Sequence, residues 1–390
     1  MNFDVIIIGA GASGLMCAIT AGERGRNVLL LEGARNIGNK ILISGGGNCN
    51  FTNLHVSPEH YFSQNPKFCI SALSRFTPQD FIKLLGKHRI SYNEKKSGRL
   101  FCNHGSEKIV KMFINECKAN GVTIKTNSLV INIDKKEKFI VTTKSDKFVT
   151  DSLVIATGGL SYPKLGTTGF GYSIAEQFGL AIITRYPALV PLTFTGSDRK
   201  RYQGLSGVSV SAKVSIDKIS FEENILFTHK GLSGPAILQI SGYWTKGKTI
   251  TINLLPYLNL EDEINKWKMS SPKSEIKTIM SKHLPRNLVT FFLENSIKDK
   301  LINQISKQDL KTLSEVFQKW QFKPEETEGY NKAEVTGGGI DTRELSPKTF
   351  ESRKVSGLYF IGEVLDVTGW LGGYNLQWMW SSGYCAGMFV

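Results

Sequence analysis

The hydrophobic pattern at the start of the chain alternates between short apolar runs and amphipathic stretches. Val5–Ile8 and Val28–Leu31 are uninterrupted apolar runs, which is typical of buried parallel strands. In Pro78–His88 and Glu107–Ala119, apolar side chains recur every three or four residues, and this spacing predicts helices that bury one face. The first third of the chain therefore predicts an α/β domain built around a parallel sheet.

Short strand-like segments follow the second of these helices, with turn residues between them. They are Val122–Lys125, Leu129–Ile133, Phe139–Thr143 and Lys147–Thr150. Their spacing predicts a small meander of β-strands. The apolar run Leu153–Ala156 then predicts a buried strand that leads directly into Thr157 and Gly158.

The pattern changes near residue 192 and changes back near residue 334. Residues 205–255 show the alternation of β-strands, and residues 260–320 show helical spacing with many lysines. Beyond that stretch the glycine-rich, strand-forming pattern of the first third returns. We therefore predict that residues 1–191 and 334–390 form one nucleotide-binding domain, interrupted by an inserted β-rich and helical domain at residues 192–333.

Composition narrows the class of protein. The chain has 390 residues, enough for two or three domains, and no apolar run approaches the roughly 18 residues that a membrane span needs. The N-terminus lacks the basic segment of a signal peptide. The six cysteines show neither C-x-x-C pairs nor the spacing of zinc ligands. We therefore expect a cytoplasmic protein with reduced thiols and no metal site.

The formal net charge of +14 admits two interpretations. A basic face could bind nucleic acid or a membrane surface. The lysines are spread along the chain, however, without a block of five or six like charges, which favours an ordinary lysine-rich surface. We therefore expect a small-molecule substrate and no nucleic-acid partner, although the charge keeps the nucleic-acid alternative open.

A glycine pattern directly follows the first apolar run. Gly9, Gly11 and Gly14 fit G-x-G-x-x-G. In that pattern the first glycine permits a tight turn, the second lets the backbone approach a pyrophosphate, and the third lets the next helix pack closely. Glu32 ends the second apolar run, where a carboxylate can accept hydrogen bonds from ribose hydroxyls. Strand, glycines, helix and acid together predict a dinucleotide-binding unit.

Residues 40–53 are the most unusual stretch of the chain. The glycines Gly45–Gly47 are flanked by hydroxyl and amide side chains, among them Ser44 and Asn48. Such a backbone suits close approach to a flat or anionic group, and Lys40 could neutralise a phosphate. We favour a ligand-binding loop over a flexible surface turn, because surface turns rarely carry so many amide side chains.

The C-terminal segment distinguishes between the dinucleotides. The predicted strand Leu358–Ile361 ends at Gly362 and Glu363, where a carboxylate could hold the ribityl or ribose part of a flavin dinucleotide. The sequence Gly372–Asn375 opens the last helix, whose N-terminus can stabilise negative charge at the pyrimidine end of a flavin. A C-terminal segment that returns to the N-terminal unit is typical of flavin enzymes rather than of simple NAD dehydrogenases. The predicted cofactor is therefore FAD.

Two residues are candidates for catalysis. His229 lies in a Gly/Ser-rich loop and could donate a proton toward the flavin or hold a domain junction by hydrogen bonding, and the sequence leaves both alternatives open. Tyr374, in the turn that opens the last helix, is the second candidate. Arg99 and His104 could also reach substrate or cofactor, although surface positions are favoured for both.

Four motifs, in this order along the chain, resemble those of the BaiN-like NAD(P)/FAD-dependent oxidoreductases, also called aminoacetone-oxidase-like flavoproteins. The motifs occupy residues 44–53, 156–163, 227–235 and 372–377. Two positions depart from the family pattern. Asn48 stands where the family usually has Arg, and Cys102 stands where it often has Pro.

The resemblance implies an α/β fold, namely an FAD-binding two-dinucleotide domain that is Rossmann-like and of the glutathione-reductase type. It also implies an inserted β-barrel-like and helical domain on the substrate side, and flavin contacts in the segments described above. The complete set of predicted cofactor-binding residues is Gly9, Gly11, Ser13, Gly14, Glu32, Gly33, Lys40, Ser44, Gly46, Asn48, Cys49, Asn50, Val130, Thr157, Gly158, Gly362, Glu363, Gly372, Gly373, Tyr374 and Asn375.

The predicted function is that of an FAD-dependent oxidoreductase. We expect hydride transfer through flavin N5 to or from a small organic substrate, with the reaction direction and the oligomeric state left open. NAD(P)H would be a transient electron donor, because no second G-x-G-x-x-G unit follows a strand. The alternatives are a flavoprotein that acts on or binds nucleic acid, of the tRNA-modifying type, and a flavin-binding protein without catalysis.

Overall fold

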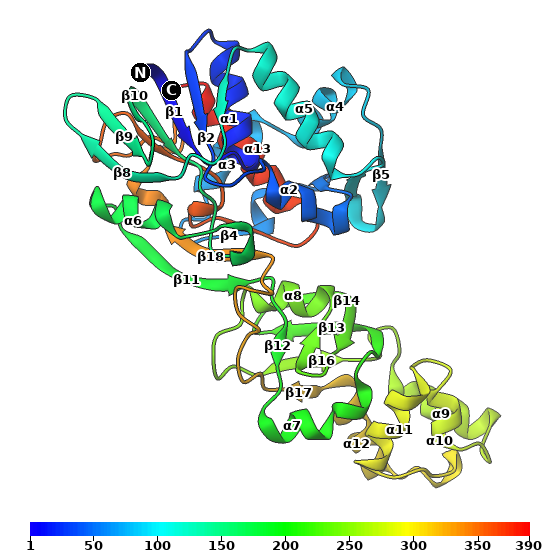
Figure 1. The fold of residues 1–390 in the computed structure, drawn as a ribbon. Coiled ribbons are helices and arrows are strands. Elements are labelled where there is room, and N and C mark those ends of the chain that lie inside the picture. Colours follow the sequence, from blue (N-terminus) through cyan, green and yellow to red (C-terminus); the bar gives the residue numbers. More distant parts are fainter. The chain divides into compact units, whose positions relative to one another are not determined.

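The computed structural model describes residues 1–390, and the chain divides into two compact units. The first unit comprises Met1–Pro187 and Glu334–Val390, and the second comprises Ala188–Ala333. In Figure 1 the second unit is coloured from green to orange, and the first unit carries both the blue and the red ends of the chain. The sequence prediction starts the inserted domain at residue 192, whereas the second unit begins at Ala188.

A seven-stranded sheet forms the centre of the first unit. Its parallel part has the order β7-β2-β1-β10-β19, and Val5 of β1 lies between Val28 of β2 and Ser152 of β10. The apolar run of β1 is at most 6% exposed, as expected for a strand that is covered on both faces. The parallel strands are β1 (Asn2–Ile8), β2 (Val28–Leu31), β7 (Thr123–Lys125), β10 (Lys147–Ile155) and β19 (Leu358–Phe360).

The sheet continues beyond β10 as a meander. The strands β8 (Val130–Lys135) and β9 (Phe139–Thr143) pair antiparallel with each other, and β9 pairs with the first half of β10. The prediction that residues 122–125 belong to this meander is wrong, because β7 pairs in parallel with β2. The physical reason is the helix α5 (Ser106–Ala119), which returns the chain so that β7 enters as a parallel partner. The two strands predicted at 147–150 and 153–156 are one continuous strand, β10.

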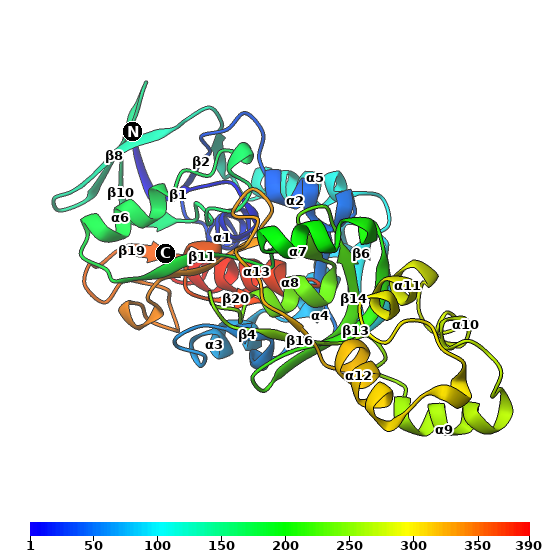
Figure 2. The ribbon, with the colours of Figure 1, turned by 90° about the horizontal axis from the view of Figure 1, so that it is seen from below.

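Two helices pack closely in the first unit because glycines line their contact. The helix α1 (Ala12–Glu23) follows the glycine turn, and α13 (Tyr374–Gly387) is the last helix. A Cβ on Gly383 would lie 2.4 Å from the carbonyl oxygen of Ser13, so the two backbones touch. Figures 1 and 2 both draw these helices side by side.

Shorter elements surround this core. The remaining helices of the first unit are α2 (Asn39–Ile43), α3 (Phe68–Arg75), α4 (Pro78–Lys87) and α6 (Phe170–Gln177). The remaining strands are β3 (Asn50–Asn53), β4 (Tyr61–Phe62), β5 (Tyr92–Lys95), β6 (Arg99–Cys102), β11 (Ile182–Ala188), β18 (Val335–Ile340) and β20 (Thr368–Gly369), which form small sheets in the orders β3-β6-β5, β4-β20 and β11-β18.

The second unit combines one antiparallel sheet with six helices. The sheet has the order β12-β15-β14-β13-β16-β17, and α8 packs against β13 and β14. The strands are β12 (Leu192–Thr193), β13 (Ser209–Ile216), β14 (Ile219–Phe227), β15 (Gly231–Ser233), β16 (Ile250–Asn253) and β17 (Trp320–Phe322). The helices are α7 (Gly196–Arg201), α8 (Pro235–Ser241), α9 (Leu260–Ser270), α10 (Ile276–Met280), α11 (Arg286–Glu294) and α12 (Lys307–Gln318). None of the helices in either unit has the length and apolar character that crossing a bilayer requires.

Candidate cofactor-binding site

The turn between β1 and α1 depends on three glycines. Gly9 has a φ of +107°, and a Cβ there would lie 2.4 Å from the carbonyl oxygen of Ala156. A Cβ on Gly14 would lie 1.9 Å from the carbonyl oxygen of Gly9, whereas a Cβ on Gly11 would meet nothing within 4 Å. Gly11 also caps α1 without a side-chain hydrogen bond. The first N–H groups of α1 are therefore open to an anionic group such as a pyrophosphate.

Three of the predicted cofactor-binding residues, Glu32, Gly33 and Val130, lie close together beside this turn. The Glu32 carboxylate accepts a hydrogen bond from the Ala10 N–H at 2.8 Å, which holds it against the glycine turn and leaves lone pairs for ribose hydroxyls. A Cβ on Gly33 would lie 3.1 Å from Cδ1 of Leu129. Val130 follows directly on Leu129, so the structure brings Val130 to the Glu32 end of the site.

The carboxyl ends of β10 and β19 supply four more of the predicted residues. Gly158 follows β10 with a φ of +72°, and a Cβ there would meet nothing within 4 Å. The hydroxyl oxygen of Thr157 is buried and has no hydrogen-bond partner. Gly362 follows β19, and a Cβ there would lie 2.5 Å from Oγ of Ser13. In open α/β sheets, ligands bind outside the carboxyl ends of the strands, which is where these residues lie.

A buried carboxylate joins three distant segments of the first unit. Glu363 is 5% exposed and accepts hydrogen bonds from Nζ of Lys40 at 2.6 Å, from Oγ of Ser161 at 2.9 Å and from the N–H of Thr336 at 3.0 Å. From the sequence we expect Lys40 to neutralise a phosphate and Glu363 to hold the ribityl or ribose part of the flavin. In the structure these two residues form an ion pair with each other.

The triple-glycine loop has a left-handed backbone. Gly45, Gly46 and Gly47 have φ values of +58°, +67° and +88°, which glycine adopts without steric strain. A Cβ on Gly45 would lie 2.7 Å from the backbone nitrogen of Asn50, whereas a Cβ on Gly46 or Gly47 would meet nothing within 4 Å. The backbone of this loop is therefore accessible to a flat or anionic group.

The side chains around the loop differ in what they can reach. Asn48 is exposed. The Ser44 hydroxyl donates to the carbonyl oxygen of Ile41 at 2.7 Å. Cys49 is fully buried, and this burial raises the pKa of its thiol to about 12, so the thiol stays protonated and points away from solvent. Asn48 and the glycine backbone can therefore face a ligand directly, but the Cys49 thiol cannot.

The start of α13 contacts the strand that follows the triple-glycine loop. A Cβ on Gly373 would lie 2.3 Å from the carbonyl oxygen of Thr52. The Asn50 side-chain oxygen accepts a hydrogen bond from the Gly373 N–H at 3.1 Å when the side-chain nitrogen is oriented to donate to backbone carbonyl oxygens. The Asn375 side chain accepts from the Gly369 N–H and donates to the Gly369 carbonyl oxygen, both at 2.8 Å. Asn50 and Asn375 thus position the helix start.

Tyr374 lies in an aromatic cluster at this helix start. Its ring centroid is 4.8 Å from that of His60, and the His60 centroid is 4.7 Å from that of Trp370. Burial raises the pKa of the Tyr374 phenol, an effect that the Arg99 charge opposes, and burial lowers the pKa of His60. Arg99 approaches from β6, since a Cβ on Gly372 would lie 2.9 Å from its Nε. Tyr374 therefore keeps its proton near neutral pH.

The other catalytic candidate belongs to the second unit. His229 is exposed two residues after the end of β14, and its carbonyl oxygen accepts a hydrogen bond from Nε of Arg199 at 3.1 Å. His104 is exposed in the first unit, with Nε2 3.0 Å from Oγ of Ser91. Of the two catalytic candidates, Tyr374 is therefore grouped with the predicted cofactor contacts. No three His, Cys, Asp or Glu side chains are placed to share a metal ion.

These segments fit a flavin dinucleotide. Gly11, Gly46 and Gly158 lie in three different segments, and at each of them an added Cβ would enter open space. The start of α1 suits a pyrophosphate, Glu32 suits a ribose, and the start of α13 suits a group that becomes negatively charged. The buried hydroxyl oxygen of Thr157 still has hydrogen-bonding capacity. Taken together, the fold and these groups define a flavoprotein oxidoreductase with a Rossmann-type FAD-binding domain.

The chain belongs to the HI0933-like family. The family model described as "HI0933-like protein Rossmann domain" matches residues 3–389. This match confirms the family resemblance, the fold class and the assignment of FAD that the sequence predicts.

Three curated relatives cover nearly the whole chain. The "Ribosomal RNA dihydrouridine synthase" of Haemophilus influenzae is 50% identical over 99% of this chain and 98% of its own length. The Escherichia coli protein of the same name is 49% identical over 99% of this chain and 97% of its own length. The "3-dehydro-bile acid delta(4,6)-reductase" of Clostridium scindens is 29% identical over 98% of this chain and 97% of its own length.

Two solved structures align with nearly the whole chain at low sequence identity. The 3-ketosteroid-Δ4-(5α)-dehydrogenase of Rhodococcus jostii RHA1 is 12% identical, with a TM-score of 0.49 over 99% of this chain and 97% of that chain. A flavocytochrome c3 fumarate reductase is 15% identical, with a TM-score of 0.48 over 99% of this chain and 78% of that chain.

Sequence reasoning missed several residues of the site. Ser161 lies in one of the quoted motifs, so its position beside Glu363 was within reach. Thr336 precedes a second glycine triplet, Gly337–Gly339, which was not singled out. A Cβ on Gly338 would lie 2.2 Å from the carbonyl oxygen of Thr184, so that triplet serves the close packing of β18 on β11. No sequence pattern predicts the contacts of His60, because its aromatic partners lie some 310 residues away along the chain.

Proposed function

We propose that this protein is an FAD-dependent reductase that converts uridine to dihydrouridine in ribosomal RNA. The observation that supports this most strongly is the 50% identity with the Haemophilus influenzae ribosomal RNA dihydrouridine synthase, over 99% of this chain and 98% of the relative. The match therefore includes every segment of the candidate site and the inserted unit. An RNA substrate takes the place of the small organic substrate that the sequence analysis favours.

The chemistry of uridine fits a flavin reductase. The C5=C6 bond of uracil is conjugated with the C4 carbonyl group, so a hydride adds at C6 and a proton adds at C5. When bound, reduced FAD supplies the hydride, and we propose NAD(P)H as the source of its electrons. The net reaction consumes one NAD(P)H and one proton for each dihydrouridine formed.

The groups of the first unit can serve this reaction in three ways. The glycine turn and Glu32 would hold the ADP half of FAD, and the start of α13 would stabilise negative charge at the flavin. The proton for C5 needs a donor that is protonated at neutral pH. We infer that Tyr374 is this donor rather than His229, because Tyr374 is grouped with the predicted cofactor contacts and burial raises its pKa.

The third relative supports the same type of reaction on another substrate. A 3-dehydro-bile acid carries a ketone at C3, and its Δ4,6 double bonds are conjugated with that ketone. Reduction of an alkene conjugated with a carbonyl group is therefore common to the reactions that the relatives' names describe. A small enone is the second candidate substrate, and the 29% identity makes it the weaker one.

The test is a product assay on unmodified RNA. Ribosomal RNA transcribed in vitro is incubated with the FAD-loaded protein and either NADH or NADPH, then digested to nucleosides and analysed by mass spectrometry. We expect dihydrouridine, two hydrogens heavier than uridine, at one or a few positions. If the protein oxidises NAD(P)H with a steroid-type dienone but leaves every uridine in full-length ribosomal RNA unchanged, the second candidate is correct.

A further inference from the structure

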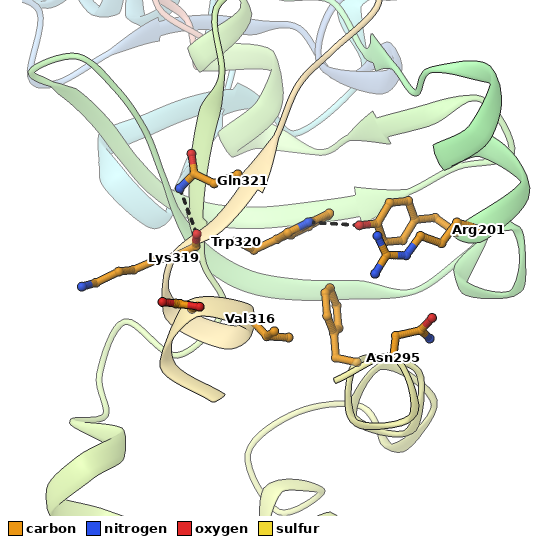
Figure 3. Close-up of a pocket in the computed structure, with 9 residues that line it drawn as sticks. Arg201, Asn295, Val316, Lys319, Trp320 and Gln321 are labelled. Atoms are coloured by element: carbon orange, nitrogen blue, oxygen red, sulfur yellow. Dashed lines mark hydrogen bonds between the residues drawn. The ribbon is translucent and has the colours of Figure 1, made fainter. Parts of the chain in front are cut away.

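The second unit contains a cavity of about 460 Å³ that lies outside the candidate cofactor site. Figure 3 shows its lining, which comes from the ends of α7, α11 and α12 and from the start of β17. The residues are Arg201, Tyr202, Phe292, Asn295, Glu315, Val316, Lys319, Trp320 and Gln321. The volume is within the ~300–1,000 Å³ range of sites that bind small organic groups.

Aromatic side chains form the inner part of this cavity. The ring centroids of Tyr202 and Trp320 are 5.4 Å apart, and so are those of Phe292 and Trp320. The indole N–H of Trp320 donates to the hydroxyl oxygen of Tyr202 at 3.2 Å, which fixes the two rings relative to each other. All three residues are less than 9% exposed. The cavity thus ends at a rigid aromatic wall, and the small exposed part of these rings can contact a flat ring.

The mouth of the cavity is polar and mainly basic. Arg201 and Lys319 are both exposed, and neither forms an ion pair in the structure. The Arg201 guanidinium lies 5.5 Å from the ring centroid of Tyr202. Asn295, Gln321 and Glu315 add amide groups and one carboxylate. Figure 3 shows the Lys319 side chain pointing away from the rings. An occupant would therefore meet the aromatic rings and the Arg201 guanidinium, and a chain leading away from the cavity could reach Lys319.

The surroundings of the cavity carry an excess of positive charge. Arg199 and Lys200 directly precede Arg201 in α7. Residues 276–322, which run from α10 to the end of β17, contain eight lysines and arginines against four aspartates and glutamates. A polyanion is attracted to such a surface.

We propose that this cavity binds an unpaired base of the RNA substrate, with Arg201 and Lys319 contacting the neighbouring phosphates. Single-stranded RNA is recognised by stacking of its bases on aromatic side chains combined with cations along its backbone. The presence of Glu315 favours a base over an acidic peptide as the occupant. Its carboxylate would repel an acidic peptide, but it can accept hydrogen bonds from the N–H groups of a base. The inference rests on the proposed function and adds a second RNA contact, in the unit that does not carry the cofactor site.

Charge-reversal variants at the mouth test the proposal without disturbing the buried rings. Arg201→Glu and Lys319→Glu are compared with Lys218→Glu, which makes the same charge change at an exposed site in the β13–β14 turn. Binding of a ribosomal RNA fragment is measured across a salt series. We expect each mouth variant to weaken binding about tenfold and to reduce the slope of log K against log salt by about one. The control should change binding by less than about twofold.

Ultraviolet cross-linking identifies the contact directly. The wild-type protein is irradiated with the RNA fragment, and cross-linked peptides are mapped by mass spectrometry. We expect a nucleotide attached to the peptide that contains Tyr202 or Trp320, and we expect this product to be lost in Arg201→Glu. If neither peptide is labelled, or if the mouth variants bind RNA as the control does, the cavity does not bind the base.

The two proposals fail in different ways. If the proposed function is wrong, the wild-type protein makes no dihydrouridine. If only the cavity proposal is wrong, the wild-type protein makes dihydrouridine, and Arg201→Glu and Lys319→Glu make it with an unchanged KM for RNA. In both cases the variants should retain full FAD absorbance, because the substitutions lie in the second unit. Loss of FAD from a mouth variant would show that the cavity contributes to cofactor binding, which would contradict the proposal.

Discussion

At the scale of single residues, two features position the segments of the candidate site in the first unit. Glycines allow backbone segments to lie in contact, and the buried Glu363 carboxylate joins three segments by hydrogen bonds. Gly9, Gly14 and Gly373 are required by neighbouring backbone atoms of the protein itself. Gly11, Gly46 and Gly158 are not, since an added Cβ there would meet only open space. The two groups of glycines therefore respond differently to substitution. Those with backbone neighbours support the fold, and those that face open space can support a ligand.

Substitution of glycine by alanine separates these two roles. Gly11→Ala should leave the thermal stability of the cofactor-free protein unchanged and raise the Kd for FAD at least tenfold, about 1.4 kcal/mol, because its methyl group would occupy the space that a pyrophosphate approaches. Gly14→Ala should lower the free energy of unfolding by about 2 kcal/mol, because its methyl group would overlap the Gly9 carbonyl oxygen. Calorimetry and flavin absorbance titrations measure both. Equal FAD affinity of Gly11→Ala and wild type would contradict the assignment.

The Lys40–Glu363 pair gives a second prediction at this scale. Lys40→Met should lower the free energy of unfolding by about 3 kcal/mol, because it leaves the Glu363 carboxylate buried without its cation. The matched control is Lys138→Met, which breaks an ion pair with Asp151 whose members are both more than half exposed. It should change stability by less than about 1 kcal/mol. Urea denaturation measures the free energy of unfolding of the two variants. Equal losses would show that the Lys40–Glu363 pair stabilises the fold no more than an exposed ion pair does.

Tyr374 is the residue on which the proposed proton transfer depends. Tyr374→Phe should lower the rate of dihydrouridine formation by about 100-fold while FAD content and the rate of flavin reduction by NAD(P)H stay at the wild-type level. His229→Gln, in the second unit, serves as the comparison and should retain most of the activity. If His229→Gln loses activity and Tyr374→Phe retains it, His229 is the proton donor, which is one of the two roles that the sequence leaves open for it.

At the scale of elements, the contact between α1 and α13 joins the first and the last segments of the chain. The glycines of α13 permit this contact, as the 2.4 Å approach of a Gly383 Cβ to the Ser13 carbonyl oxygen shows. The start of α13 is in turn positioned by Asn50 and Thr52, next to the triple-glycine loop. Displacement of α13 would therefore alter both ends of the candidate site.

A Gly383→Ala substitution tests this connection. We expect it to lower the free energy of unfolding by about 2 kcal/mol through overpacking and to weaken FAD binding as well. The control is Gly86→Ala in α4, where a Cβ meets nothing within 4 Å. This control should stabilise the protein by up to about 1 kcal/mol through helix propensity. Unchanged FAD affinity in a folded Gly383→Ala protein would show that the α1–α13 contact does not position the site.

Sequence reasoning succeeds at this scale where a pattern is local. The strands β1 and β2, the helices α4 and α5 and the glycine turn each have a period or a motif within a few residues. It fails where the structure depends on distant partners. The short strand β7 resembles a meander strand until its pairing with β2 is seen. The partners of Glu363 lie 323, 202 and 27 residues away from it along the chain. No local pattern encodes such convergence.

At the scale of the whole molecule, the chain consists of a cofactor unit interrupted by a second unit with its own sheet and its own aromatic cavity. The HI0933-like family model extends over both. The sequence alone identifies the family, the fold and FAD, because the motifs of the first unit carry them. It does not identify the substrate, since the cavity-lining residues of the second unit are scattered between positions 201 and 321 and form no motif.

A single-turnover experiment would show directly whether the protein reduces uridine in ribosomal RNA. The protein is loaded with FAD, reduced without oxygen and mixed with unmodified ribosomal RNA in the absence of NAD(P)H. Flavin absorbance and nucleoside composition are then followed together. We expect the oxidised flavin spectrum to return as one dihydrouridine forms per FAD. Reduced FAD that persists in the presence of the RNA, with no dihydrouridine formed, would contradict the proposed function.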